Sequence, residues 1–265
     1  MTNETRTVSR RERLRAQTLQ EIEDTSFAII DADGVQALSV AALARSMAMS
    51  APAVYRYFPS RDALVAHLAT LSYQQLAAAM SQAVEGGRRA PRTRVRLVVT
   101  AYRDWALRYR RRYGMLFGER AGDLPGGPSD GGPSGGGPSD GGLPGEVTGQ
   151  AGQSGQTAQA AQTPLDQAMA LLMDLLVAVQ GTASADSTSG DRTLDGQLLR
   201  LRARSQERPD VAPGVAHAAI LIWTRVHGIV SLELTGAFDN HTINARRLID
   251  LEIDNAVRSL RPSGS

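Results

Sequence analysis

Two tyrosines and two arginines lie in the stretch SAPAVYRYFPSRD, residues 50–62, although aromatic residues make up only 5% of the chain. Phenol hydroxyls and guanidinium groups donate hydrogen bonds to phosphate oxygens, and a guanidinium can also form a paired contact with guanine. A serine opens the stretch and Phe58-Pro59 ends its helix, so the polar side chains before Phe58 are expected on one very short helix. Their chemistry suits contact with a nucleic acid.

The short helix divides by face. Val54 and Phe58 are four residues apart and are expected to point inward. Ser50 is the expected N-cap, with the N–H of Ala53 as its partner, and a proline in the first turn is tolerated because that N–H has no helical partner. The residues left on the outside include two small side chains that allow close approach to DNA: Ala51, Pro52, Tyr55 and Arg56.

A second helix is expected directly before this one, with Ser39 as its N-cap. Helix, tight break and short helix over residues 39–58 have the outline of a helix-turn-helix. An earlier helix ends at Gly34, and its apolar stripe supports the pair, so residues 10–76 form the predicted DNA-binding domain. The two stripes at helical spacing are Leu19, Ile22, Ser26, Ile29 and Ile30, then Val40, Leu43, Ala44 and Met47.

The rest of the chain also reads as helical, so the predicted fold is all-α, with a helical C-terminal domain over residues 77–262. Periodic apolar residues predict helices at 61–85, 92–117, 165–180, 194–206, 213–236 and 243–260. A segment rich in Gly, Pro and Ser at 121–162 cannot bury enough apolar surface to fold, so it is expected to be a disordered linker. A shorter break, residues 181–191, reads as a loop.

Composition excludes several classes of protein. The chain of 265 residues has no cysteine, which excludes disulfides, thiolate catalysis and Cys-ligated zinc. We find no apolar run of membrane-spanning length and no signal peptide, so we expect a cytoplasmic protein. No catalytic pattern stands out, and the spacing of His217, His227 and His241 does not suit a metal site. We therefore expect neither an enzyme nor a cofactor.

The stretch DGVQALSVAALARSMAMSAPAVYRYFPSRDALVAHL, residues 33–68, resembles the DNA-binding domain of the TetR (tetracycline repressor) family. The chain departs from the family pattern at Ala48, where the family commonly has Gly, and at Arg61, where it commonly has Lys. Ala48 matters only if the turn requires a positive φ, which alanine resists. The resemblance implies a DNA-contacting set: Ser39, Ser50, Ala51, Pro52, Tyr55, Arg56, Tyr57 and Arg61. Ala53 adds at most a methyl contact to thymine.

The C-terminal half resembles one TetR subgroup, marked by a Trp-x3-His-Gly motif at Trp223, His227 and Gly228. Such domains dimerise and often bind a small ligand. Trp223 and His227 share a helix face, where they either line a cavity or pack as core beside a close helix approach at Gly228. Met-rich apolar residues nearby suit either a core or an adaptable pocket. The predicted ligand pocket consists of Trp105, Phe117, Met173, Trp223 and His227.

The last two helices carry the predicted dimer interface, as two apolar stripes that would form a four-helix bundle across a two-fold axis. The alternative is that these stripes face only their own domain. The predicted interface residues are Ile222, Val226, Leu248, Ile249, Ile253 and Val257. The basic run RYRRR, residues 108–112, is expected to be solvated or to face the DNA-binding domain rather than to contact DNA.

Together these features predict a dimeric transcriptional regulator that binds a palindromic operator in double-stranded DNA and is released by a small-molecule effector. A repressor is the expected form. A ligand-independent architectural DNA-binding protein is one alternative. A helical enzyme with an incidental helix-turn-helix is another, and it has little support in the sequence.

Overall fold

The computed structural model of the chain describes residues 9–86, 89–118, 164–181, 191–197 and 211–260. Every regular element in these ranges is a helix, which confirms the all-α prediction. The predicted linker at 121–162 lies outside the described residues. Of the helix predicted at 194–206, residues 194–197 are helical and the remainder lies outside the described residues.

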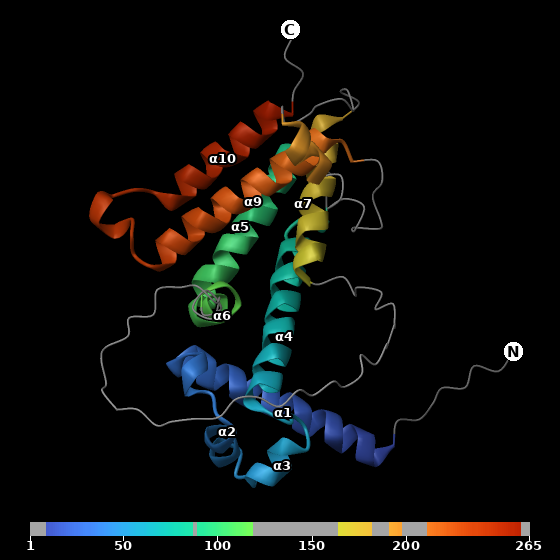
Figure 1. The fold of residues 1–265 in the computed structure, drawn as a ribbon, viewed down its shortest axis with the longest axis vertical. Helices are drawn as coiled ribbons and strands as arrows, with labels where there is room; N and C mark the ends of the chain where they lie inside the picture. The colour runs from blue at the N-terminus through green and yellow to red at the C-terminus, as the bar shows by residue number, and fades with distance from the viewer. Residues whose placement is uncertain (1–8, 87–88, 119–163, 182–190, 198–210, 261–265) are drawn as a thin grey trace, which may run out of the picture.

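The DNA-binding domain consists of α1 (Arg10–Asp33), the 3-10 turn η1 (Val35–Ala37), α2 (Val40–Ser46) and α3 (Ala51–Tyr55), which lie at the foot of Figure 1. α1 starts at a capping box, in which the Ser9 hydroxyl accepts from the Glu12 N–H and the Glu12 carboxylate accepts from the Ser9 N–H. It ends where predicted, at Gly34, whose φ of +86° suits glycine.

α4 (Arg61–Gln82) joins the two halves of the molecule. Its first turns belong to the DNA-binding domain, where Leu64 and Leu68 are completely buried. Its last turns belong to the C-terminal domain, where Leu76 and Met80 are equally buried. The predicted domain boundary at residues 76–77 therefore falls inside a continuous helix, which belongs to both halves (Figure 1).

The C-terminal domain contains α5 (Pro91–Arg108), α6 (Arg110–Phe117), α7 (Pro164–Gln180), α9 (Pro213–Leu234), the 3-10 turn η3 (Asp239–His241) and α10 (Ala245–Ser259). α9 packs between α10 and α7, and α5 packs on α4 and α7. The helix predicted at 92–117 is broken at Tyr109, which has φ −118° and ψ 53°. The break lets α6 turn toward the DNA-binding domain, where it contacts α1, η1 and α4.

α9 is more apolar than the sequence analysis recognised. An 18-residue window of this helix has a mean hydropathy of 1.4, so its length and composition alone would allow a membrane span. One face of α9 packs inside the C-terminal domain, however, and Val215, Ala219 and Val230 are completely buried there. The helix thus has a core face in this fold, and its hydropathy is accounted for in part by that packing.

Candidate functional site

The break between α2 and α3 is a tight helix end that forces one residue into the left-handed region. The Met49 N–H donates to the Ala44 carbonyl and the Ala48 N–H donates to the Arg45 carbonyl, which is the hydrogen-bond pair of a Schellman motif. Ala48 occupies the position after the C-cap with a φ of +52°. The turn therefore has the conformation that glycine adopts most readily, yet it carries alanine.

α3 sits against the core through two side chains. Val54 is completely buried and Phe58 is 7% exposed, as predicted, so they fix the orientation of the short helix. The Ser39 hydroxyl caps α2 by accepting from the Ala42 N–H at 3.1 Å. Ser50 stands at the N-cap of α3, but its side chain makes no capping hydrogen bond; its carbonyl oxygen accepts from the Ala53 N–H instead. The predicted side-chain cap at Ser50 is thus wrong.

The outer side of α3 presents a small apolar surface beside polar tips. Pro52 and Arg56 are exposed, and Tyr55 is a large aromatic side chain that is 51% exposed. Tyr57 is half-buried, and the guanidinium of Arg15 from α1 lies 5.8 Å from the centre of its ring. The first turns of α1 therefore reach the end of α3.

Arg61 has a structural role that the sequence did not reveal. Its Nε donates to the Leu38 carbonyl and its Nη2 donates to the Val35 carbonyl, each at 2.7 Å. These bonds fasten the start of α4 to the loop between α1 and α2. Two of the guanidinium nitrogens are thereby engaged within the DNA-binding domain, which positions this loop, and Nη1 lies 3.8 Å from the Asp62 carboxylate.

A second group of polar side chains meets inside the C-terminal domain. The Tyr102 hydroxyl from α5 lies 2.8 Å from His227 Nδ1 of α9, and the Tyr113 hydroxyl from α6 lies 3.0 Å from the same nitrogen. Tyr113 also lies 2.9 Å from the Ser231 hydroxyl. Aromatic rings enclose the group: Phe117 and Trp223 contact the imidazole, with ring centres 4.8 Å and 6.4 Å from it. We call Tyr102, Tyr113, Trp223, His227 and Ser231 the tyrosine–histidine cluster.

Burial keeps the tyrosine–histidine cluster uncharged near neutral pH. Desolvation lowers the pKa of His227, so its imidazole is neutral, and Nδ1 can accept a hydrogen bond from a tyrosine hydroxyl. Desolvation likewise raises the pKa values of Tyr102 and Tyr113. Hydroxyls and a neutral imidazole in an apolar setting favour hydrogen bonding to a neutral molecule over the binding of an ion.

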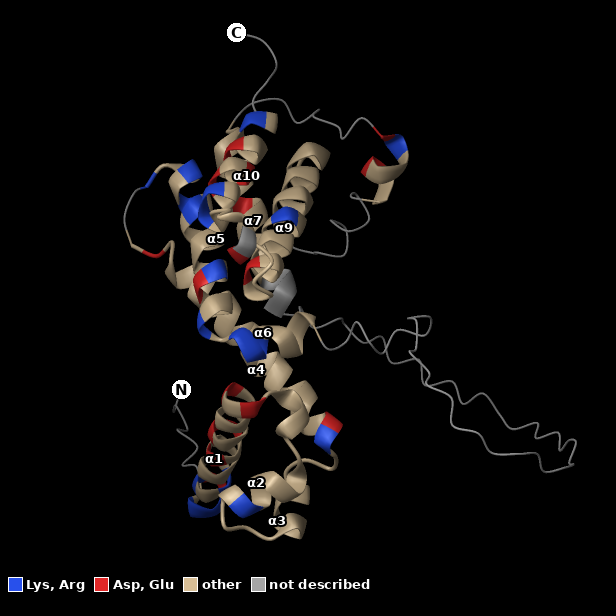
Figure 2. Ribbon diagram, turned by 90° about the vertical axis from the view of Figure 1, so that its left-hand side faces the viewer, with Lys and Arg blue, Asp and Glu red and all other residues tan. Residues whose placement is uncertain are grey.

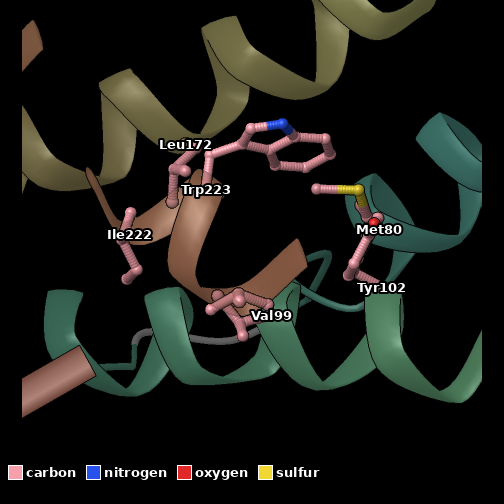
Figure 3. A pocket seen from close by; sticks show the side chains of 7 residues that line it. Met80, Val99, Tyr102, Leu172, Ile222 and Trp223 are labelled. Carbon is pink, nitrogen blue, oxygen red and sulfur yellow. The ribbon is translucent and has the colours of Figure 1, made fainter. Parts of the chain in front are cut away.

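A small apolar cavity adjoins the cluster. It has a volume of about 10 Å³, which is close to the space that a single water molecule needs. Its walls come from α4, α5, α7 and α9, and in Figure 3 the indole of Trp223 and the side chain of Met80 lie on one side of it. The lining residues are Met80, Val99, Tyr102, Leu172, Ile222, Trp223 and Val226. The cavity is too small for a larger ligand, which must move some of these side chains to enter.

Family models match both halves of the chain. The model described as bacterial regulatory proteins of the tetR family matches residues 22–68, and the model described as the tetracyclin repressor-like C-terminal domain matches residues 144–256. The chain belongs to the TetR family. It is a DNA-binding transcriptional regulator, and the helix-turn-helix of α2 and α3 lies within the first match.

Solved structures agree with this assignment. A regulatory protein named SCO4313 is 26% identical, with a TM-score of 0.60, over 94% of this chain and 98% of that one. A protein of unknown function from Rhodococcus sp. RHA1 is 19% identical, with a TM-score of 0.55, over 97% and 98% of the two chains, and so shares the fold. No curated protein matches the sequence.

The structure of this chain brings together only part of the predicted ligand pocket. Phe117, Trp223 and His227 meet in the tyrosine–histidine cluster. Trp105 is 5% exposed and its ring contacts Tyr109, and Met173 is 7% exposed within the core; neither lines the cavity. Among the described residues no helix approaches Gly228 closely, since a Cβ there would meet no atom within 4 Å.

The tyrosines of the cluster were missed, because nothing local marks them. Tyr102 and Tyr113 lie on either side of the break at Tyr109, and only that break turns both hydroxyls toward α9. A sequence search for polar residues opposite the Trp-x3-His pair could have found them only with the break known in advance.

Most of the predicted dimer residues are core residues of a single chain. Ile222, Val226, Ile249, Ile253 and Val257 are at most 5% exposed within one subunit, so they are not available to a second copy. Leu248 is half-buried. The interpretation that these stripes face their own domain is therefore the one the structure supports. An amphipathic stripe shows which face is buried, and α9 and α10 bury it against each other and against α5 and α7.

Arg112 confirms the expectation that the basic run at residues 108–112 faces the DNA-binding domain, although its individual partners were not predicted. Its side chain is 11% exposed, and its Nε lies 2.9 Å from Asp31 of α1. Its Nη1 lies 3.0 Å from Gln75 of α4, and its guanidinium stacks 4.0 Å above the ring of Phe27. α6 thus contacts the DNA-binding domain through Arg112 and the tyrosine–histidine cluster through the next residue, Tyr113.

Proposed function

We propose that this TetR regulator is a homodimeric repressor that leaves its operator when a small neutral molecule binds at the tyrosine–histidine cluster. The observation that carries the proposal is the position of α6. Tyr113 of α6 hydrogen-bonds to the cluster, and the adjacent Arg112 is held by Asp31 and Gln75 of the DNA-binding domain. A ligand that moves Tyr113 therefore also acts on a contact that holds the DNA-binding domain.

DNA is read by the outer side of α3 in this proposal. Tyr55 and Arg56 are exposed there, and Pro52 and Ala51 leave room for the backbone to approach the groove. Arg56 is the residue that can form a paired contact with guanine, whereas Tyr55, Tyr57, Ser39 and Ser50 offer hydroxyls to flanking phosphates. Two-fold symmetry would place the two α3 helices about 34–36 Å apart, so the operator is expected to be palindromic.

The effector is expected to be uncharged and in part aromatic. Rings of Tyr102, Trp223 and Phe117 supply flat apolar contacts, and the neutral His227 with its tyrosines supplies hydrogen bonds. Because the cavity is too small for such a molecule, binding requires that side chains such as Met80 and Trp223 rotate away. A ligand shifts the equilibrium between two states only by its difference in affinity for them, so the opened state must also disfavour DNA binding.

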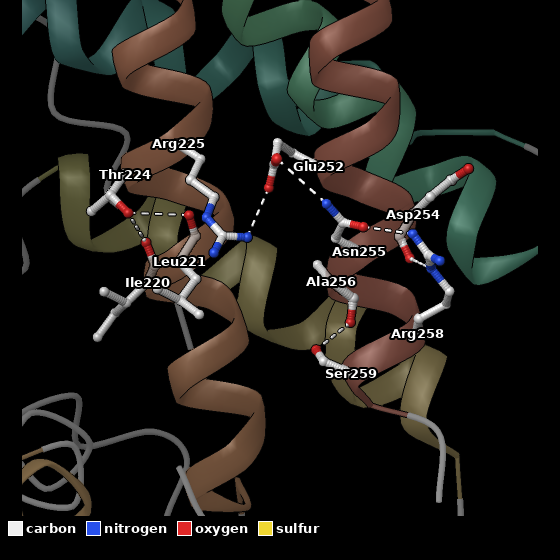
Figure 4. Close-up of polar contacts among 10 residues, drawn as sticks. All are labelled: Ile220, Leu221, Thr224, Arg225, Glu252, Asp254, Asn255, Ala256, Arg258 and Ser259. Carbon is white, nitrogen blue, oxygen red and sulfur yellow. Dashed lines mark hydrogen bonds and ion pairs between the residues drawn. The ribbon is translucent and has the colours of Figure 1, made fainter. Parts of the chain in front are cut away.

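Dimerisation is proposed to use the outward face of α9 and α10, not the buried stripes. On α9, Leu232 is 48% exposed, and Gly228 presents open space where a second helix can approach closely. Figure 4 shows that Arg225 of α9 pairs with Glu252 of α10. The proposed contact face consists of Leu221, Thr224, Gly228 and Leu232 on α9 with Leu248, Glu252 and Asn255 on α10.

The dimer face is tested with Leu232→Arg. A charge that replaces an apolar contact between subunits is costly to bury, so this variant is expected to elute as a monomer in size-exclusion chromatography with light scattering. Leu14→Arg is the matched control, since Leu14 of α1 is 54% exposed and lies outside the proposed face. A dimeric Leu232→Arg variant would show that the subunits meet elsewhere.

Release by a ligand is tested with the two tryptophans of the chain. Operator sequences are first selected from random DNA, and small neutral aromatic compounds are then screened for release of the protein. Trp223→Phe is expected to reduce the response to a releasing compound, with operator affinity unchanged. Trp105→Phe is the control, and it leaves Trp223 as the only indole, so its fluorescence should change on binding. Operator binding that ignores every compound would favour a ligand-independent architectural protein.

The subgroup marked by Trp-x3-His-Gly is the proposed place of this chain within the TetR family. Supporting it, the rings of Trp223 and His227 are nearly parallel, with an interplanar angle of 16°, and both belong to the proposed effector site. Gly228 belongs to the proposed dimer face. The protein is proposed to act in the cytoplasm, and no catalytic function is assigned to it.

A further inference from the structure

The first turns of α1 carry a concentration of positive charge that the helix-turn-helix does not explain. Arg10, Arg11, Arg13 and Arg15 are all exposed, and among the described residues none of them has an acidic partner. Glu12, which lies among them, is occupied by the capping box with Ser9, and these hydrogen bonds lower the pKa of its carboxyl. Figure 2 shows this basic end of α1 at the level of α2 and α3, away from the acidic end of the helix.

The arrangement is unfavourable for α1 itself. Positive charges near the first turn oppose the helix dipole, and like charges four residues apart, such as Arg11 and Arg15, repel each other. Some exposed arginines of the C-terminal domain do have acidic partners: Arg92 and Arg96 of α5 pair with Asp254 and Asp250 of α10. A cluster that costs the helix stability and has no acidic partner suggests a ligand of opposite charge.

Helical spacing divides the four arginines into two pairs. Arg11 and Arg15 continue the stripe of Leu19 and Ile22, which packs on the DNA-binding domain, at intervals of three and four residues. Figure 1 shows that α1 extends past α3, so this stripe emerges from the domain at its N-terminal end. Arg10 and Arg13 lie on the opposite side of the helix.

The contact of Arg15 with Tyr57, two residues after the end of α3, indicates that Arg11 and Arg15 are the pair on the DNA side. The Arg15 guanidinium lies 5.8 Å from the ring centre of Tyr57, directly after the residues proposed to enter the groove. A guanidinium that stacks on a ring keeps the N–H groups on its edge available for phosphate. Arg11, one turn earlier on the same side, extends the line of charge away from α3.

We propose that Arg11 and Arg15 form a second phosphate-binding element, which holds the DNA backbone beyond the half-site read by α3. The inference rests on the proposed mode of DNA binding through α3. Backbone contacts carry no sequence information, so the pair is expected to add affinity for all duplexes, to make binding more sensitive to salt, and to lengthen the footprint at each outer edge.

The test compares two double variants of the full chain that have the same net charge. Arg11→Gln/Arg15→Gln removes the proposed pair, and Arg10→Gln/Arg13→Gln removes the opposite pair. Fluorescence anisotropy gives the dissociation constant for a selected operator and for a random duplex between 50 and 300 mM NaCl, roughly the range over which phosphate contacts are lost. Hydroxyl-radical footprinting of the operator gives the protected phosphates, and thermal melting checks the fold.

Arg11→Gln/Arg15→Gln is expected to lower the slope of log K against log[salt] by about 1.8 per DNA-binding domain, at about 0.9 per phosphate contact, on both duplexes. It should also lose the outermost protected phosphates, and its melting temperature should be unchanged or higher. Arg10→Gln/Arg13→Gln is expected to change the slope by less than half as much. Equal changes in both variants, or none, would overturn the inference. A parent chain that selects no DNA sequence would overturn the proposed function as well, which separates the two failures.

Discussion

Ala48→Gly should make this regulator more stable, although substitution of alanine by glycine usually does the reverse. Ala48 ends α2 in the left-handed region, with φ +52°, and its side chain is exposed, so the methyl group makes no core contact that glycine would lose. Two hydrogen bonds of the Schellman motif hold the residue in this conformation, through the N–H groups of Ala48 and Met49.

The size of the effect follows from two opposing terms. A non-glycine residue in the left-handed region costs about 1–2 kcal/mol, which glycine releases. Against this, glycine lowers stability by about 0.4–1 kcal/mol, because it gives the unfolded chain more conformational freedom. Taken at the middle of each range, the difference is a stabilisation of about 0.8 kcal/mol, and for a chain of this size that corresponds to a rise in melting temperature of roughly 2–3 °C.

Thermal denaturation followed by circular dichroism measures the effect, with Ala66→Gly as the matched control. Ala66 is also exposed but lies inside α4, where the same substitution should cost about 1 kcal/mol. Ala48→Val should be less stable than the parent, because a branched side chain is poorly tolerated at positive φ. A melting temperature lowered equally by Ala48→Gly and Ala66→Gly would refute the reasoning, since it would show that the turn stores no strain.

Three further predictions concern other parts of the chain. Thr242→Gly, at the second non-glycine residue with positive φ (+51°), should also raise the melting temperature; a fall would show that its hydroxyl bond to the His241 carbonyl matters more. Asp31→Asn removes the charged partner of Arg112 and should cost about 1–3 kcal/mol in urea denaturation, with an unchanged midpoint as the contrary result. For His227, the folded pKa lies below the unfolded value, so its contribution to stability is present above about pH 6.5 and is lost as the pH falls through the folded pKa. The stability lost between pH 7.5 and 5.5 should therefore be smaller in His227→Gln than in the parent, and equal losses would refute this account.

The helices could be predicted because their signals are local. Ser39 and Ser60 cap α2 and α4 through their side chains, and Gly34 ends α1, as capping residues at those positions indicate. The departure of Ala48 from the family pattern raised the question of whether this turn requires a positive φ, and the φ of +52° shows that it does. In each of these cases a single residue and its nearest neighbours determine the conformation.

The candidate sites were harder to predict because they depend on packing between distant segments. An apolar stripe such as Ile249, Ile253 and Val257 must be buried, but the stripe alone does not say whether its own domain or a second subunit covers it. Arg61 likewise reads as a free cation in the sequence, and only the fold brings the carbonyls of Val35 and Leu38 within its reach.

The chain contains arginine but no lysine. The residue type therefore does not separate an arginine with a structural role from one that is free to bind DNA, and the partner of each arginine has to be examined instead. Arg112 pairs with Asp31, and Arg225 pairs with Glu252. Salt screens a pair less when it is buried, and an exposed pair contributes only about 0–1 kcal/mol to stability, so added salt should change the stability of the fold only modestly. Arg15 and Arg56 have no acidic partner among the described residues, and a DNA phosphate would be the first anion to neutralise them. Salt should consequently act far more strongly on DNA affinity than on folding, because release of counterions from DNA scales with the number of phosphates contacted. A regulator built in this way can lose its operator while its fold remains intact, which is what reversible release by an effector also requires.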